Sequence, residues 1–403
     1  MTDPASALIA EEGAAIEPLT TSRILLVDDS AVMLSVIRKY LEVHGFNNIQ
    51  VAANGEEALQ AAHAWHPDLI LTDIQMPVMD GYDLCRKIRA GTEMPDVPVL
   101  FMTGLTKPED RNGAFSAGAS DLISKPVDHL ELVGRLRVHL DRRRLIKRLF
   151  EYHDRMAQEL DQARKMQEAI LPGVAVQEQV QAKYPVKFGS FYRASIGLGG
   201  DLWSIHQLGP ERLMVCLVDF SGHGVGAALN TFRFQTFLNN VAPKSASPNH
   251  LLGMANTFLY TQLPRGQFAT MFCGLIDFSK ETLSYSSASA PPVLVGDQST
   301  DRNLRLLETA GLPLGLVEDS DYEALGIDFK PGSFLLMYSD ALIETPEPPQ
   351  SIFSPDTLCA LVSASTGDLE PDRLVEDVVS HLLSNSPSSP DDDLTLVCLN
   401  YCP

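Results

Sequence analysis

A long stretch without helix-breaking residues divides this chain. Residues 129–171 are rich in Arg, Leu, Glu and Gln, and neither glycine nor proline occurs from Arg135 to Leu171. The stretch therefore predicts one long helix, which Pro172-Gly173 ends. Because 403 residues exceed what one ordinary core holds, we expect a domain on each side of this helix.

Apolar residues along the predicted helix recur at alternating steps of three and four, as in a coiled coil. Glu159 breaks the seam, whose members are Leu145, Leu149, Tyr152, Met156, Ala163, Met166 and Ile170. The spacing favours a parallel homodimer that is stable only when the preceding domains also associate. The alternative is a single helix that packs its apolar stripe on the domain that follows.

Before the helix, four apolar runs each end in polar residues, and helical patterns alternate with them. These polar residues are Asp28 with Asp29, Asp73, Thr103 and Lys125. Strands that alternate with helices at this spacing predict an α/β fold with a doubly wound, parallel, five-stranded sheet. Such sheets carry their site beyond the carboxyl ends of the strands, so we expect these residues to meet there.

This part of the chain, from about Ser22 to Arg142, resembles the receiver domain of two-component response regulators. The resemblance implies that Asp28, Asp29 and Asp73 hold one Mg²⁺ and that Asp73 accepts a phosphoryl group from a histidine kinase. It also implies switch roles for Thr103, which would hydrogen-bond a phosphoryl oxygen, and for Lys125, which with Mg²⁺ offsets the carboxylate charge. Receivers usually carry an aromatic residue where this chain has Leu122, so we expect the signal to travel by backbone and packing shifts.

After the helix, aspartates again lie beside strand-like runs. Asp201 and Asp219 flank Leu213–Val218, Asp340 follows Phe334–Tyr338, and three aspartates at 391–393 precede Leu394–Leu399. Carboxylates that face one another across strand ends repel unless a cation lies between them. Oxygen ligands favour Mg²⁺ or Mn²⁺. For Asp201 and Asp219 alone, the alternative is a β-hairpin with two surface aspartates.

The second half resembles the metal-dependent serine/threonine phosphatases (the PPM family), in particular the bacterial branch tied to sporulation and stress signalling. The matching motifs keep the family's order between about Phe188 and Leu399: Gly199-Gly200-Asp201, Asp219–Gly224, Phe268–Asp277, Pro291-Pro292, Gly311–Gly315, Tyr338-Ser339-Asp340 and Asp392–Thr395. The many short strands with helices outside them agree with the implied α+β fold of two antiparallel sheets flanked by helices. One departure is Ala341, where the family usually has glycine.

The resemblance implies hydrolysis of phosphoserine or phosphothreonine on a protein by two Mn²⁺ or Mg²⁺ ions. Asp219 would bridge both ions and, with Asp201, serve catalysis. Asp201 would contact one ion together with the backbone carbonyl of Phe220. The other ion would take Asp340 and Asp392, with Asp393 as the alternate to Asp392. His223 is either an acid for the leaving oxygen or a turn histidine held by a backbone group.

Charge and composition limit the partners. The net charge of −21 argues against nucleic-acid binding, and no apolar run reaches the roughly 20 residues that span a bilayer. The N-terminus lacks the features of a signal peptide, and the six cysteines show no zinc-like spacing, which indicates a reducing cytoplasmic location. We expect a disordered tail at 1–21, a receiver at 22–142, a helical linker at 143–182 and a phosphatase domain at 183–403.

Together these patterns predict a response regulator in which phosphorylation of Asp73 controls a protein phosphatase. By family resemblance the substrate would be a small phosphorylated regulator such as an anti-sigma-factor antagonist. The alternative is a catalytically weak domain that acts as a phosphorylation-controlled adaptor for a partner protein. The replacements at Leu122 and Ala341 keep that alternative open.

Overall fold

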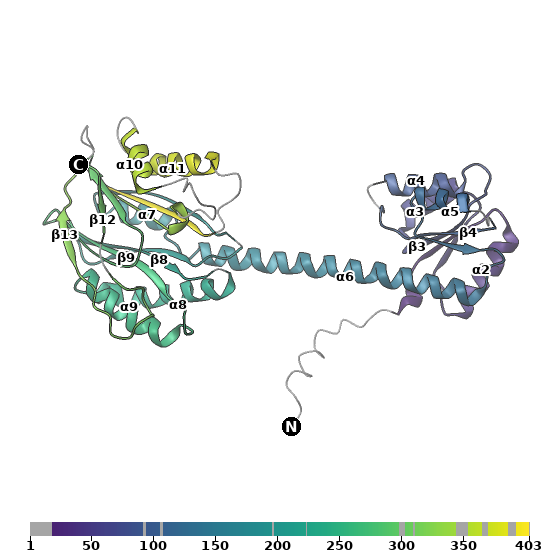
Figure 1. Cartoon of the computed structure of the whole chain (residues 1–403), viewed down its shortest axis with the longest axis horizontal. Helices are drawn as coiled ribbons and strands as arrows, with labels where there is room; N and C mark the ends of the chain where they lie inside the picture. Colours follow the sequence, from purple (N-terminus) through teal and green to yellow (C-terminus); the bar gives the residue numbers. More distant parts are fainter. Residues whose placement is uncertain are drawn as a thin grey trace, which may run out of the picture. The chain divides into compact units, whose positions relative to one another are not determined.

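The computed structural model describes residues 18–91, 94–104, 108–195, 197–222, 224–297, 303–308, 311–343, 354–364, 370–385 and 392–402, with backbone alone at 108–111 and 385. The chain divides into two compact units, Met1–Arg155 and Met156–Pro403. Figure 1 shows the helices and strands that make up each unit.

The first unit is built on a parallel sheet of five strands in the order β2-β1-β3-β4-β5. The strands are β1 (Ile24–Val27), β2 (Ile49–Ala52), β3 (Leu69–Asp73), β4 (Val99–Thr103) and β5 (Asp121–Ser124). Alternate residues of the same strand enter different cores: Leu25 and Val27 join one cluster, whereas Ile24 and Leu26 join another. Both faces of the sheet are therefore covered, which explains the uninterrupted apolar runs. The predicted doubly wound fold is confirmed.

Helices α2 (Ala31–Val43), α3 (Gly55–Trp65), α4 (Gly81–Ala90) and α5 (Pro108–Ser116) connect these strands. Side chains immediately before the first three helices cap them, since Ser30, Asn54 and Asp80 accept hydrogen bonds from backbone N–H groups of the first turn. The caps fix where each helix begins, and α2 and α4 begin after the loops that carry the strand-end aspartates.

The long helix exists as α6 (His129–Glu168), three residues shorter at its end than the glycine- and proline-free stretch. Its first turns belong to the receiver core through Leu132, Val133, Leu136 and Leu140. The seam residues that follow are largely exposed, for example Leu149 with 67% of its surface accessible.

The second unit contains two antiparallel sheets of five strands each. One has the order β13-β10-β9-β8-β7, with β7 (Asp201–Gln207), β8 (Arg212–Phe220), β9 (Ala269–Asp277), β10 (Thr282–Ala288) and β13 (Leu325–Asp328). The other has the order β12-β11-β14-β15-β6, with β6 (Val186–Arg193), β11 (Val293–Asp297), β12 (Arg305–Leu307), β14 (Ser333–Tyr338) and β15 (Leu394–Tyr401). The predicted pair of antiparallel sheets is confirmed.

Helices cover the outer face of each sheet. A core that includes Trp203, Phe272 and Leu335 lies between the sheets. Helices α8 (Val225–Val241) and α9 (Pro248–Gln262) pack on the first sheet, and α10 (Pro355–Ala364) and α11 (Pro371–Asn385) on the second (Figure 1). The short helix α7 (Val174–Gln181) lies within the stretch 143–182, for which the sequence predicts a helical linker.

Several expectations concern residues outside the described ranges. They include most of the predicted tail (1–17), His223 and Asp391. At the end of the predicted tail, Leu19–Thr21 instead form the 3-10 helix η1, because Leu19 packs against the receiver core. Within the described part of the chain, no helix combines the length and apolar character needed to cross a bilayer.

Candidate functional site

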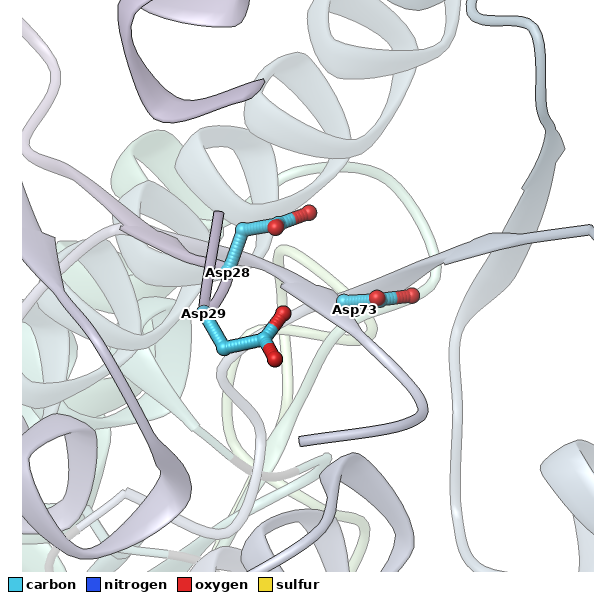
Figure 2. Close-up of side chains that lie close together, drawn as sticks. All are labelled: Asp28, Asp29 and Asp73. Carbon is cyan, nitrogen blue, oxygen red and sulfur yellow. The ribbon is translucent and has the colours of Figure 1, made fainter. Parts of the chain in front are cut away.

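Three receiver carboxylates meet at the carboxyl ends of two neighbouring strands. Asp28 and Asp29 follow β1 and Asp73 ends β3, and one oxygen from each lies within 4.8 Å of the others (Figure 2). Asp28 is only 1% exposed, whereas Asp29 is open to solvent. Three carboxylate oxygens at this spacing form a hard donor set of the kind that Mg²⁺ prefers. The residues thus fit the predicted magnesium site.

Lys125 lies against this cluster. Its Nζ is 2.9 Å from Oδ2 of Asp73 and 3.2 Å from Oδ2 of Asp28. Burial acts to lower the pKa of Lys125, but the hydrogen bond and charge of Asp73, followed by the charge of Asp28, outweigh it and raise that pKa. The ammonium is therefore held in its charged form between two carboxylates that would otherwise repel.

Backbone contacts orient these carboxylates. The N–H of Ser30 donates to Oδ1 of Asp28 at 2.9 Å, and the N–H of Ile74 donates to Oδ1 of Asp73 at 2.8 Å. Gly81 is needed beside them, because a Cβ there would lie 2.3 Å from the carbonyl oxygen of Asp73. Thr103 is buried at the end of β4, and its carbonyl accepts from the N–H of Lys125 at 2.7 Å.

In the second unit, Asp201 and Asp219 face each other directly across the β7–β8 pair. Asp201 is 1% exposed, and its Oδ1 is buried with no hydrogen-bond partner among the described residues. Burial and the charge of Asp219 raise the pKa of Asp201 well above its usual range. Burial, followed by the charges of Asp340 and Asp392, raises the pKa of Asp219 to about 8. The fold therefore concentrates negative charge here, and neither Asp201 nor Asp219 forms an ion pair within the described ranges.

This arrangement fits divalent cations. A hard cation would give the buried Oδ1 of Asp201 the partner that it lacks. Carboxylate oxygens are also the ligands that such a cation prefers. In contrast to the receiver, no three of these carboxylates offer oxygens within 4.8 Å of one another among the described residues. The carboxylates thus gather around Asp219 without forming a single three-ligand cluster.

Asp392 and Asp393, which the sequence left as alternates, differ in their surroundings. Asp393 is 2% exposed, and its two oxygens accept from the backbone N–H groups of Ser195 and Gly200. Asp392 is exposed, and its one hydrogen bond among the described residues is local, from the N–H of Asp393 at 2.8 Å. Asp393 therefore holds the loop before Asp201, whereas Asp392 keeps a carboxylate available to a ligand.

That loop also meets the end of β8. A Cβ on Gly200 would lie 2.7 Å from the carbonyl oxygen of Phe220, so only glycine allows this approach. Asp340 begins the 3-10 helix η3 (Asp340–Leu342) after β14. Ala341 lies inside that helix and does not have a positive φ, so the family's glycine is not required here by backbone conformation.

Sequence reasoning missed three polar residues that support the site. Thr395 donates from Oγ1 to Oδ2 of Asp201, and Ser339 donates from Oγ to the carbonyl of Asp393 at 2.9 Å. The third is Gln167, near the end of α6, which is 1% exposed. Ser339 and Thr395 lie inside the motifs Tyr338-Ser339-Asp340 and Asp392–Thr395 and could have been assigned a role from them, but nothing in the helix pattern singles out Gln167.

The side chain of Gln167 forms hydrogen bonds with both the N–H and the carbonyl of Gly199. Its Oε1 accepts from the N–H of Gly199 at 3.0 Å, and its Nε2 donates to the carbonyl of Gly199. Nε2 also donates to Oγ1 of Thr231 on α8 at 3.1 Å. Because Gly199 is two residues from Asp201, the end of α6 is bonded directly to the loop that carries a candidate metal ligand.

Comparison with known proteins agrees with both halves. The model of the response regulator receiver domain matches residues 24–137, and that of Stage II sporulation protein E (SpoIIE) matches residues 209–401. The transcriptional regulatory protein YvrH of Bacillus subtilis is 39% identical over 124 residues, which are 31% of this chain and 51% of that protein. The phosphoserine phosphatase RsbP of Bacillus subtilis is 27% identical over 190 residues, which are 46% of this chain and 45% of that protein.

The chain thus spans about half the length of these curated relatives. Among solved structures, the SiaA-PP2C domain of Pseudomonas aeruginosa superposes with a TM-score of 0.52 at 18% identity, covering 62% of this chain and 98% of that one. At this identity the likeness establishes the fold.

Proposed function

Because the chain joins a response regulator receiver domain to a SpoIIE-family domain with a PP2C-like fold, we propose that it is a metal-dependent protein serine/threonine phosphatase controlled by phosphorylation of Asp73. The proposal keeps the receiver at 22–142, the linker at 143–182 and the phosphatase domain at 183–403. The substrate would be a phosphoserine or phosphothreonine on a small regulatory protein, such as an anti-sigma-factor antagonist. The similarity to the phosphoserine phosphatase RsbP supports a phosphoserine substrate.

The observation that carries the proposal is the uncompensated charge around Asp219. Its pKa of about 8 and the orphaned Oδ1 of Asp201 require a cation for both carboxylates to be ionised at neutral pH. Asp219 would be shared between two ions, Asp340 and Asp392 would serve one, and Asp201 with the Phe220 carbonyl the other. Two Mn²⁺ or Mg²⁺ ions would supply Lewis-acid activation of water and neutralise phosphoryl oxygens.

In the receiver, Asp73 would accept a phosphoryl group from a histidine kinase. The ion pair with Lys125 places a fixed positive charge next to the oxygen that reacts. A phosphoryl group on Asp73 adds negative charge there, so Lys125 would follow it and its bond to Asp28 would weaken. Mg²⁺ held by the three aspartates would neutralise the transferring oxygens.

The linker helix offers a route between the sites. Near its beginning, Nη1 of Arg135 lies 2.9 Å from both oxygens of Asp121 on β5, the strand that leads to Lys125. Near its end, Gln167 holds Gly199. We propose that a change at β5 alters the position or pairing of α6, and that Gln167 passes this change to the loop before Asp201.

Exposure along the middle of α6 supports pairing of two chains. Leu145, Leu149 and Tyr152 are each more than 60% exposed, although the seam's last member, Ile170, packs against the second unit's core. A coiled-coil partner would cover the exposed apolar side chains. Sedimentation of the full chain and of Leu149→Lys tests this homodimer, and a monomer for the unaltered chain at high concentration would exclude it.

The decisive experiment measures hydrolysis of a phosphoserine peptide by the full chain. Mn²⁺, Mg²⁺ or a chelator is supplied, each with and without a beryllofluoride complex that mimics phosphorylated Asp73. We expect turnover that needs metal and changes with beryllofluoride, and the direction of that change gives the sign of control. Absence of turnover from folded protein in every condition would contradict the proposal and favour the protein-binding adaptor.

A further inference from the structure

The first unit contains a pocket of about 500 Å³ that neither candidate site uses. One wall comes from the segment that enters β1, together with Asn48 and Asp68, and the other from one face of α6. The lining residues are Pro18, Leu19, Thr21, Ser22, Arg23, Asn48, Asp68, Leu140, Arg143, Arg144, Lys147, Arg148 and Glu151. Arg23 and Asp68 directly precede β1 and β3, so the pocket lies at the amino ends of the strands. The aspartate cluster lies at their carboxyl ends.

The pocket is basic in a strongly acidic protein. Its lining holds five cationic and two anionic side chains, whereas the whole chain has a net charge of −21. Of the two acids, Asp68 already accepts from the N–H of Arg23 at 2.8 Å and lies 3.8 Å from its guanidinium. In the part of the chain that the structure describes, the one ion pair of Glu151 is an exposed, 3.9 Å contact with Lys147. The cationic side chains therefore outnumber the acids that could balance them.

The three α6 arginines that line the pocket, Arg143, Arg144 and Arg148, have no ion pair among the described residues. Nη2 of Arg144 is buried and has no hydrogen-bond partner within the described ranges. Burial lowers the pKa of Arg143, and the charges of Asp68 and Asp96, which act to raise that pKa, do not outweigh it. A buried guanidinium nitrogen without an acceptor is costly, and an anion would satisfy it.

We propose that this pocket binds a small, phosphate-bearing polyanion. Guanidinium groups present paired N–H donors that match the oxygens of a phosphate, and several lie on one wall here. The volume falls in the range of small-molecule sites. Since no aromatic side chain lines the described pocket, it offers no surface on which a base would stack, and the phosphate groups are the part recognised.

Such a ligand would join α6 to the body of the receiver. Leu140 to Glu151 form one wall and Arg23 with Asn48 another, so a polyanion that contacts both holds the helix from two sides. The exposed seam begins within the same stretch, at Leu145. The pocket thus gives the linker a chemical input that is separate from phosphorylation of Asp73.

Calorimetric titration of the full chain with inorganic pyrophosphate tests the site. A chelator is present so that the aspartate clusters carry no cations and repel the probe. We expect binding that weakens with salt, and a loss of about tenfold or more in Arg144→Gln, because charge-assisted bonds are lost. Arg142→Gln is the matched control: it removes the same charge from an exposed neighbour on α6 that does not line the pocket. Its affinity should change by less than about twofold.

Arg148→Gln provides a second variant with an exposed side chain, in case Arg144→Gln does not fold. Pyrophosphate should also slow amide exchange in residues 140–151 of the unaltered chain. The proposal is overturned by no binding at about 1 mM probe, or by equal losses in Arg144→Gln and Arg142→Gln. Binding that appears only after residues 1–17 are deleted would overturn it in favour of the chain's own acidic segment as the occupant.

Discussion

Replacing Gln167 by leucine tests whether the end of α6 controls the second site. Leucine keeps most of the volume but removes both bonds to Gly199, the bond to Thr231 and the 3.4 Å bond that Oε1 accepts from the Tyr192 hydroxyl. The N–H and C=O of Gly199 would then be buried without these partners. Each such group costs about 1 to 3 kcal/mol, so the pair costs about 2 to 6 kcal/mol if nothing moves.

We expect the loop at 197–200 to shift so that the N–H and C=O of Gly199 find other partners, and this shift would displace Asp201. If only the lower bound of about 2 kcal/mol is transferred to the site, the apparent metal affinity falls about thirtyfold. The catalytic constant at saturating metal should fall less than the metal affinity, since Asp219 keeps its place on β8.

The assay is phosphoserine-peptide hydrolysis as a function of Mn²⁺ concentration, with circular dichroism to verify folding. Gln162→Leu is the matched control, because it makes the same chemical change at an exposed position five residues earlier on α6. Equal metal dependence in the two variants would refute the coupling through Gln167, whatever the absolute rates.

Two further variants test other parts of the second unit. Asp219→Asn should abolish hydrolysis, and retained activity would contradict the two-metal assignment. In the presence of a chelator this variant should melt at the same or a higher temperature than the unaltered chain, because it removes a buried carboxylate that neighbouring carboxylates repel. Burial lowers the pKa of His206 from 6.5 to about 4, so the unfolded state binds the proton first and stability falls as pH drops from about 6.5 to 4. This contribution amounts to about 3 kcal/mol at most, and denaturant titrations should give a flatter pH profile for His206→Gln than for the exposed control His153→Gln.

The positions of the strand-end aspartates could be predicted because the apolar runs in the sequence indicate where each strand begins and ends. Apolar runs such as Leu213–Val218 are too short to be helices and are typical of buried strands. A carboxylate directly after such a run therefore lies at the end of a strand. Parallel connections then bring Asp28 and Asp73 to the same edge without further information. In the second unit, the antiparallel register of β7 and β8 places Asp201 directly opposite Asp219.

Helices and supporting contacts in the second unit were harder to predict, because tertiary packing decides them. Helix α9 contains Gly253, Asn256 and Thr257, whose helix propensity is low, and it forms because Leu251, Leu252, Ala255 and Leu259 enter a core. Asp392 and Asp393 look alike in sequence and differ only in burial and in the backbone amides that approach them. Gln167 depends on a contact across 32 residues that no local pattern encodes.

Because α6 carries polar contacts near both of its ends, its helical phase should matter more than its length. An insertion of seven residues turns the following part of a helix by about 700°, nearly two whole turns, whereas five residues turn it by about 500° and leave it about 140° out of phase. Placed after Glu151, the seven-residue insertion also preserves the heptad seam. We therefore expect beryllofluoride to control hydrolysis in the seven-residue variant and to lose that control in the five-residue variant, with basal metal-dependent activity measured in both. If both variants respond like the unaltered chain, the helix acts as a passive tether, and Gln167 serves the site without transmitting any signal from the receiver.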